Sequence, residues 1–330
     1  MSGAQKRIVA GIDEAGLGPM LGPLTLGLCV LRVPEDGAAN EWERLSAAVT
    51  DRVDGDSERL VVADSKVVYT RNPRGRARLE RTVLAFHGAR SAGGTQTVES
   101  LFEDASPELR PGSELLARHP WYSRLPGELP AWGESADLEP YRARLCEALE
   151  GSGTEVLELF PRLVPAGQLN ADFARTENKS VTTWGLCADL IRHVWERHGE
   201  HEPELVVDRQ GGRLRYAPLL WEHLPDTWIE TRAEARTGCD YLVHGKDGRR
   251  MRVVFRERAE ETSFAVALAS CTAKYLRELS MEGFNAYFAG LQKGLRPTAG
   301  YVTDARRWLE EAGPALEQAD LDPDVLVRER

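Results

Sequence analysis

Short apolar runs that end in carboxylates constrain this sequence more than any other feature. One run, Ile8 to Ile12, leads directly into Asp13 and Glu14, and another, Leu205 to Val207, ends at Asp208. Apolar runs of this length, bounded by turn residues, are typical of strands buried in a sheet. Carboxylates at strand ends of an α/β sheet point into the crevice where ligands bind. The two runs therefore predict a buried sheet with acids at a ligand site.

The rest of the chain mixes strand-like and helix-like segments. Residues 7–12 and 24–33 are expected to form a hairpin across the Gly/Pro segment 16–23. Helix-like spacing at 176–198 predicts a helix capped by Thr176 or Asn178. Further helices are expected near 37–50, 75–87, 263–279, 281–292 and 303–312, and further strands at 204–208, 228–230, 239–244 and 251–255.

Residues 91–170 break this pattern, because they are rich in proline and acidic residues. This composition predicts an insertion or subdomain. The main domain would then comprise residues 1–90 and 171–330, with a helical C-terminal part from about residue 276 to 330.

Length and charge exclude several classes of protein. The chain has 330 residues, with 42 Lys and Arg against 52 Asp and Glu, which gives a net charge of −10. The acid excess opposes long-range attraction to nucleic acid, although residues 71–78 and 246–258 are locally basic. The N-terminus lacks the pattern of a secretory signal, and the apolar stretch 20–33 is too short to span a membrane, so we expect a cytoplasmic protein. The five cysteines are expected in the core.

Glu260 adds a fourth acid, because it lies just before the apolar helix that begins near residue 263. Sites rich in oxygen, with no His or Cys close in sequence, suit Mg²⁺ or Mn²⁺ rather than zinc. The alternative is that these acids begin turns and are solvated. Acids held close together need a cation or a proton to offset their repulsion.

The glycines Gly11, Gly16, Gly18 and Gly22 allow a rival interpretation as a nucleotide-binding loop. The match is poor, because the spacing is wrong, prolines interrupt the expected helix, and two acids stand where a phosphate would approach.

Five segments in order resemble the motifs of one nuclease family. The segment 11–23, GIDEAGLGPMLGP, closely resembles the opening signature of type 2 ribonucleases H, the ribonuclease HII and HIII family. The other four segments are Asp64-Ser65-Lys66, Val206-Val207-Asp208, ASCTAK at 269–274 and GYVT at 300–303. A single motif would be weak, but the ordered set is specific.

This resemblance implies a ribonuclease H-like α/β fold, with a mixed sheet flanked by helices and a helical C-terminal part. It also implies two ions of Mg²⁺ or Mn²⁺ held by four carboxylates. These are Asp13, Glu14, Asp208 and Glu260, with Glu261 as the alternative to Glu260. Two divalent ions about 4 Å apart activate a water and stabilise the leaving oxygen in an in-line attack on phosphate.

The resemblance implies substrate contacts in the other motifs. Backbone groups of the Gly16-Leu17-Gly18 segment would contact a 2′-hydroxyl. Side-chain contacts are expected from Ser65, Lys66, Lys274 and Tyr301, with Arg74, Arg76 and Tyr287 as further candidates. Leu17 departs from the family, which usually has Arg or Lys at this position.

The implied activity is that of a type 2 endoribonuclease, a phosphodiester hydrolase. Its substrate would be the RNA strand or an embedded ribonucleotide of an RNA/DNA hybrid or ribonucleotide-containing duplex. Leu17 and the insertion leave two alternatives open. One is a structure-selective nuclease on another nucleic acid, and the other is an inactive nucleic-acid-binding module. The insertion is also a candidate surface for a protein partner.

Overall fold

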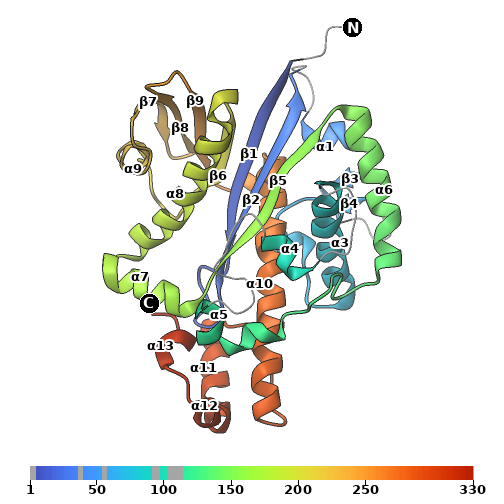
Figure 1. The fold of residues 1–330 in the computed structure, drawn as a ribbon, viewed down its shortest axis with the longest axis vertical. Coiled ribbons are helices and arrows are strands. Elements are labelled where there is room, and N and C mark those ends of the chain that lie inside the picture. The colour runs from blue at the N-terminus through green and yellow to red at the C-terminus, as the bar shows by residue number, and fades with distance from the viewer. Residues whose placement is uncertain (1–4, 36–39, 54–57, 91–96, 103–113, 330) are drawn as a thin grey trace.

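One mixed sheet forms the centre of the protein (Figure 1). The computed structural model describes residues 5–35, 40–53, 58–90, 97–102 and 114–329. The strand order is β5-β2-β1-β6-β9-β8-β7. The strands are β1 (Lys6–Ala15), β2 (Leu24–Pro34), β5 (Glu155–Val164), β6 (Glu204–Asp208), β7 (Thr227–Ala235), β8 (Gly238–Gly245) and β9 (Arg250–Arg256). β6 is parallel to β1 and to β9, and the other neighbours are antiparallel.

The predicted hairpin of residues 7–12 and 24–33 is confirmed, and the structure also has a second one. β1 and β2 pair over their whole length, with Asp13 opposite Gly27. β8 and β9 form the second hairpin around residues 246–249. A two-stranded parallel sheet, β3 (Val49–Thr50) with β4 (Leu60–Val61), lies apart from the main sheet. The predicted class, a mixed α/β sheet flanked by helices, is therefore confirmed.

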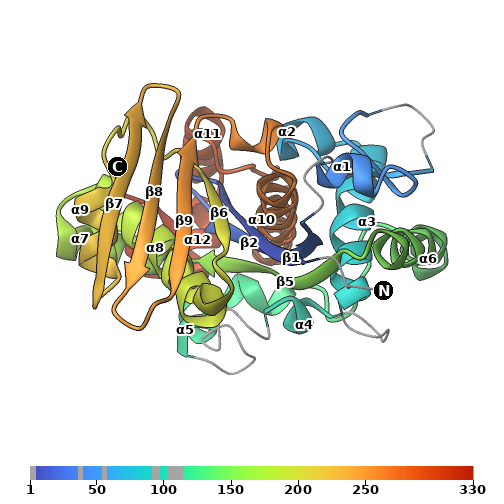
Figure 2. The same ribbon diagram turned by 90° about the horizontal axis from the view of Figure 1, so that it is seen from above.

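The two faces of β1 pack against different helices (Figure 2). Ile8, Ala10 and Ile12 pack with α8 (Lys179–His198) in one core cluster. Side chains alternate along a strand, so Gly11 and Asp13 lie on the opposite face. That face carries α10 (Phe264–Leu291), whose first half is buried on all sides. Asp13 therefore lies between the sheet and α10.

Two glycines allow α10 to lie directly on the strands. A Cβ at Gly11 would be 2.2 Å from the backbone nitrogen of Val266. A Cβ at Gly27 would be 2.0 Å from the carbonyl oxygen of Ala269. Since real Cβ atoms do not approach backbone this closely, only glycine fits at these positions.

The remaining helices cover the sheet and its ends. In chain order they are α1 (Glu41–Arg44), α2 (Ser65–Val68), α3 (Pro73–Arg90), α4 (Val98–Phe102), α5 (Glu114–Arg118), α6 (Ser135–Ser152), α7 (Ala166–Thr176), α9 (Ala217–His223), α11 (Val302–Glu311), α12 (Gly313–Ala319) and α13 (Pro323–Leu326). Short 3-10 helices are η2 (Pro120–Arg124), η3 (Gly199–His201) and η4 (Ala259–Glu261). Within the described ranges, no helix has both the length and the apolar character needed to cross a membrane.

Several sequence predictions need correction. The helix expected near 37–50 is only the four-residue α1, and residues 37–39 lie outside the described part. The helices expected at 263–279 and 281–292 are one helix, α10, because no residue between them breaks it. Four of the five cysteines are buried as predicted, but Cys146 is exposed on α6. Asn178, not Thr176, caps α8 by accepting from the backbone N–H groups of Ser180 and Val181.

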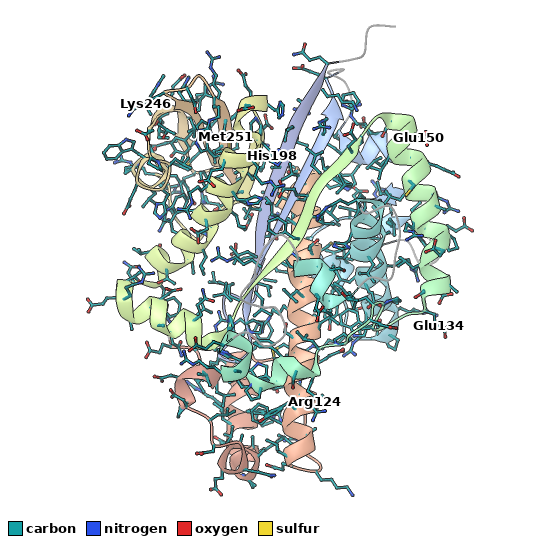
Figure 3. All side chains as sticks on the ribbon, in the orientation of Figure 1. Arg124, Glu134, Glu150, His198, Lys246 and Met251 are labelled. Carbon is teal, nitrogen blue, oxygen red and sulfur yellow. The ribbon has the colours of Figure 1, made fainter. Side chains whose placement is uncertain are left out.

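The segment 91–170 contributes to the main sheet. Its last strand, β5, pairs with β2, and Leu159 and Leu163 of β5 join the same core cluster as α10. Its helix α6 packs on α3, at the side of the molecule opposite Lys246 and Met251 (Figure 3). The division of the chain into a main domain and an insertion remains a prediction.

Candidate active site

Asp13 and Asp208 end up side by side because their strands are parallel neighbours. Ile12 of β1 pairs with Val207 of β6. The next residue of each strand is an acid, so Asp13 lies beside Asp208. Asp13 is buried and accepts a hydrogen bond from the backbone N–H of Glu14 at 2.8 Å. The Ser270 side chain on α10 lowers the pKa of Asp13, in opposition to burial. The sheet and α10 together position this carboxylate.

Asp208 also positions the turn that carries Glu260. It accepts a hydrogen bond from the backbone N–H of Ala259 at 3.0 Å, which attaches η4 to the end of β6. Glu260 is buried in η4, whereas its neighbour Glu261 is exposed and paired with Arg258. Of the two acids proposed for the fourth position, Glu260 is the one that lies with Asp208.

The four acids act on one another electrostatically. Burial, and then Glu14, raises the pKa of Asp13 well above its ordinary value. Burial, and then Asp208 and Glu260, raises the pKa of Glu14 to about 7, although Lys66 opposes this. Burial also raises the pKa of Asp208 and that of Glu260, and Asp208 raises the latter further. The site therefore gathers like charges that a cation or protons must offset.

The donor set fits a hard divalent cation. Four carboxylates, without histidine or cysteine among them, are the ligands that Mg²⁺ and Mn²⁺ prefer. Burial raises the pKa of each of these acids, and neighbouring carboxylates raise it further. The fit is one of donor type alone: within the described residues, no three His, Cys, Asp or Glu side chains are positioned so that they could hold a metal ion in this structure.

Asp64 and Lys66 stand at the rim of this group. Asp64 caps α2 by accepting from the backbone N–H of Lys66 at 2.9 Å. Lys66 is exposed, and its charge lowers the pKa of Glu14, Asp208 and Glu260. Asp64 raises the pKa of Asp208 and Glu260, which makes it a fifth acid near the site. Sequence reasoning noted Asp64 only as part of a motif.

Ser65 is buried rather than open to a ligand. Its hydroxyl accepts a hydrogen bond from Ser270 at 3.0 Å. This hydrogen bond joins α2 to α10, and Ser270 also lowers the pKa of Asp13. Sequence reasoning did not single out Ser270, although it lies in the ASCTAK motif.

The Gly16–Pro23 loop is held by segments from the far end of the chain. Arg328 donates to the carbonyl oxygens of Gly16 at 2.6 Å and Leu17 at 3.1 Å. The buried Arg277 of α10 donates to the carbonyl oxygens of Pro23 and Leu21. Burial lowers the pKa of Arg328 to about 9. Neither arginine was expected from sequence, because only the fold shows which distant backbone they reach.

Gly300 brings the GYVT motif to the same loop. Its carbonyl oxygen accepts from the backbone N–H groups of Met20 at 2.8 Å and Leu21 at 3.2 Å. Tyr301, the next residue, is about half exposed (49%), as is Leu17 (48%), whereas Tyr287 packs against the α10 core. Tyr301, Leu17 and Gly18 therefore present an open surface beside the loop.

Lys274 is engaged within the protein. Its ammonium group pairs with Glu278 at 2.5 Å and lies 4.8 Å from the centre of the Tyr69 ring. Arg76 likewise pairs with Glu282 at 2.5 Å. Arg74 is exposed at the start of α3. The contacts of these residues with a substrate remain predictions.

Comparison with known proteins gives matches only among solved structures. No family model and no curated protein matches the sequence. The ribonuclease H2 of Pyrococcus horikoshii matches with 17% identity and a TM-score of 0.44, over 97% of this chain and 92% of that one. The ribonuclease HII from the PCNA complex of Archaeoglobus fulgidus matches with 16% identity and a TM-score of 0.46, over 98% and 94%.

A ribonuclease HIII also matches. The structure of Bst-RNase HIII in complex with Mn²⁺ has 13% identity and a TM-score of 0.39, over 98% of this chain and 66% of that one. These ribonucleases are of the kind whose motifs the sequence resembles. The identities are 13–17% and the TM-scores are below 0.5, so the chemistry of the site follows from its own residues.

Proposed function

We propose that this chain is a metal-dependent endonuclease that hydrolyses the RNA strand or embedded ribonucleotides of RNA/DNA duplexes. The observation that carries the proposal is the pairing of β1 with β6, which sets Asp13 beside Asp208, while the hydrogen bond from Ala259 to Asp208 attaches the turn of Glu260. Four mutually repelling, partly buried acids destabilise a protein unless a cation binds them. The five ordered motifs support the same assignment.

The four acids would hold two ions of Mg²⁺ or Mn²⁺. When bound, such ions supply an activated water and stabilise the leaving oxygen. Glu14, whose pKa is raised to about 7, carries a proton part of the time near neutral pH and would release it when a cation binds. Lys66 is exposed beside the acids, and its ammonium group would position the phosphate.

The Gly16–Pro23 loop would distinguish ribose from deoxyribose in the substrate. Arg328 and Arg277 hold its carbonyl groups, so its backbone is fixed before substrate binds. A fixed backbone beside the acids provides a place for a 2′-hydroxyl contact, which separates RNA from DNA. Leu17 brings no positive charge to this loop, so phosphate contacts must come from other residues.

The test is cleavage of a labelled duplex with one ribonucleotide, beside an all-DNA duplex, in Mg²⁺ or Mn²⁺. We expect cleavage only at the ribonucleotide. Asp208→Asn should lower the rate by at least about 100-fold, because one oxygen donor becomes an amide. Glu261→Gln is the matched control, since Glu261 is exposed and paired with Arg258, and it should retain activity.

Other results would contradict the proposal. Equal cleavage of both duplexes would favour a structure-selective nuclease. Duplex binding without cleavage in either metal would favour a binding module. Thermal unfolding of Asp208→Asn shows whether a lost rate reflects a lost fold.

A further inference from the structure

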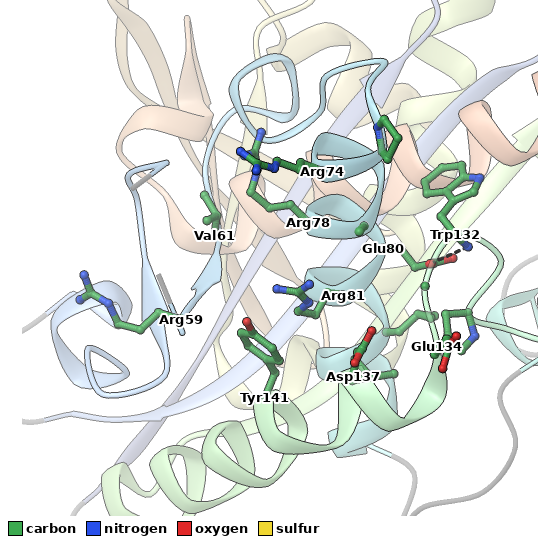
Figure 4. Close-up of a pocket in the computed structure, with 16 residues that line it drawn as sticks. Arg59, Val61, Arg74, Arg78, Glu80, Arg81, Trp132, Glu134, Asp137 and Tyr141 are labelled. Atoms are coloured by element: carbon green, nitrogen blue, oxygen red, sulfur yellow. Dashed lines mark hydrogen bonds between the residues drawn. The ribbon is translucent and has the colours of Figure 1, made fainter. Parts of the chain in front are cut away.

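A second site lies between helices α3 and α6, on the side of the molecule away from β7 (Figures 1 and 4). The pocket there has a volume of about 560 Å³ and is lined by residues of α3, α6 and the 130–134 segment, together with Arg59 and Val61. Pockets of roughly 300–1,000 Å³ are the usual size for ligands in proteins. None of the four acids of the candidate active site lines it.

Three arginines of α3 line one wall of this pocket. Arg74, Arg78 and Arg81 are four and then three residues apart, so they share a face of the helix. The guanidinium groups of Arg74 and Arg78 lie close together, and that of Arg81 lies beside Tyr141 of α6 (Figure 4). Arg81 stacks on the Tyr141 ring at 4.2 Å from its centre.

Three acids, Glu80, Glu134 and Asp137, line the same pocket as these arginines. Glu80 is buried and is occupied by the backbone N–H groups of Ala131 at 2.6 Å and Trp132 at 2.8 Å. Among the residues that the structure describes, no carboxylate forms an ion pair with Arg74 or Arg81. Within this described part of the chain, Arg74 and Arg81 therefore have no ion-pair partner, although the carboxylates of Glu134 and Asp137 line the same pocket.

Arg78 connects this pocket to the candidate active site. Its guanidinium donates to the carbonyl oxygen of Val68 at 2.7 Å, at the C-terminal end of α2. Lys66 lies on the same four-residue helix, and its charge acts on Glu14 and Asp208. Positively charged side chains, Lys66 and then Arg78, therefore extend from beside the four acids, across α2, to the pocket.

We propose that the α3–α6 pocket binds a backbone phosphate of the nucleic-acid strand, outside the segment that contacts the four acids. This inference rests on the proposed function for the identity of the ligand. Guanidinium groups suit phosphate because they donate two parallel hydrogen bonds to it. Arg74 and Arg81 make the contacts, and Arg78 holds the wall of the pocket.

The test measures binding of a labelled RNA/DNA hybrid in EDTA, by fluorescence anisotropy over a series of salt concentrations. The Arg74→Ala/Arg81→Ala variant should bind about tenfold more weakly at about 0.1 M salt, and the log–log salt slope should fall by about 1 to 2. The single variant Arg74→Ala, at an exposed position, should bind about threefold more weakly and leave the fold intact.

The matched control is Arg192→Ala/Arg232→Ala, which removes the same charge from α8 and β7, away from the pocket. It should leave affinity and slope close to those of the wild type. Equal losses in both double variants, or no loss in the pocket variant, would overturn the assignment. Thermal unfolding of each variant confirms that the fold is kept.

Two further measurements separate the sources of phosphate and the two proposals. If dTMP or inorganic phosphate binds by calorimetry and loses binding in the pocket variant while hybrid affinity is unchanged, the pocket serves a free nucleotide or phosphate, and the backbone assignment is overturned. If the wild type binds the hybrid without cleaving it and the pocket variant loses affinity, the pocket stands and the proposed function fails. Cleavage by the wild type with unchanged affinity in the pocket variant overturns the pocket alone.

Discussion

Glu14 is an acid of the candidate site whose titration reaches neutral pH. Burial, and then Asp208, raises its pKa from 4.5 to about 7. The folded protein therefore binds this proton more tightly than the unfolded chain does. Its contribution to stability is complete below pH 4.5 and is lost as the pH rises to about 7. For the metal-free protein, we expect the free energy of unfolding to fall by up to about 3 kcal/mol in this window.

The measurement is urea unfolding in EDTA at about pH 5 and about pH 8, for the wild type and Glu14→Gln. Glutamine does not titrate, so the variant should lose less stability between the two conditions. Added Mg²⁺ should raise the stability of the wild type at the higher pH, because a cation offsets the repulsion. An identical pH dependence in both proteins would contradict the assignment.

At the scale of residues, part of the site could be predicted from the sequence. Asp13 and Asp208 each follow an apolar run, and such runs mark buried strands. Glu260 could not be separated from Glu261, because adjacent residues have nearly the same local pattern. Ser270 was missed because its contact with Ser65 joins residues 205 positions apart.

At the scale of elements, the close approach of α10 to β1 and β2 determines where the acids lie. Gly27→Ala would place a methyl group 2.0 Å from the carbonyl oxygen of Ala269. Because both sides are backbone, neither can move without shifting α10 or the hairpin. We expect a loss of about 3 kcal/mol or more in unfolding free energy, together with lower activity.

The comparison is Gly185→Ala, in the middle of α8, where an added Cβ would meet nothing within 4 Å. This change should be neutral or stabilise the protein by up to about 1 kcal/mol, because alanine favours a helix. Urea unfolding of both variants measures the two changes in unfolding free energy. Equal stability of the two would show that α10 does not depend on Gly27.

Two central strands were predicted closely from the sequence, whereas β5 was missed, because it lies in the segment interpreted as an insertion. The runs at 204–208 and 251–255 match β6 and β9 within one or two residues, because buried strands need continuous apolar residues. The helix expected near 37–50 failed, because residues 49–50 pair with 60–61 instead of continuing a helix. Tertiary pairing overrides local helical preference here.

At the scale of the whole molecule, the candidate site depends on residues near both ends of the sequence. Arg328→Ala would remove the donors to Gly16 and Leu17. We expect the unfolding free energy to fall by about 1–3 kcal/mol and kcat/KM on a ribonucleotide-containing duplex to fall about tenfold. Arg328→Lys should recover little, because an ammonium group does not match the guanidinium fork.

Steady-state cleavage kinetics and urea unfolding test this prediction. Arg306→Ala, at an exposed position on α11, is the control and should change neither quantity. Metal affinity should be unaffected in Arg328→Ala, because the acids are held by β1, β6 and η4. Unchanged kcat/KM in that variant would show that the loop keeps its shape without Arg328.

The contacts that hold the Gly16–Pro23 loop also determine how late in protein synthesis the loop can take up its final structure. Its contacts with Gly300 and Arg328 join residues about 280 and 312 positions apart in the sequence. A ribosome makes the loop early and its anchors late, at roughly 5–20 residues per second. The β1–β2 hairpin has both strands from the start, but its loop gains its last partner only after residue 328 emerges. A nascent chain therefore passes through synthesis with its acids present and this loop unanchored. If the loop recognises the sugar as proposed, selective cleavage would begin only after the contact with Arg328 forms.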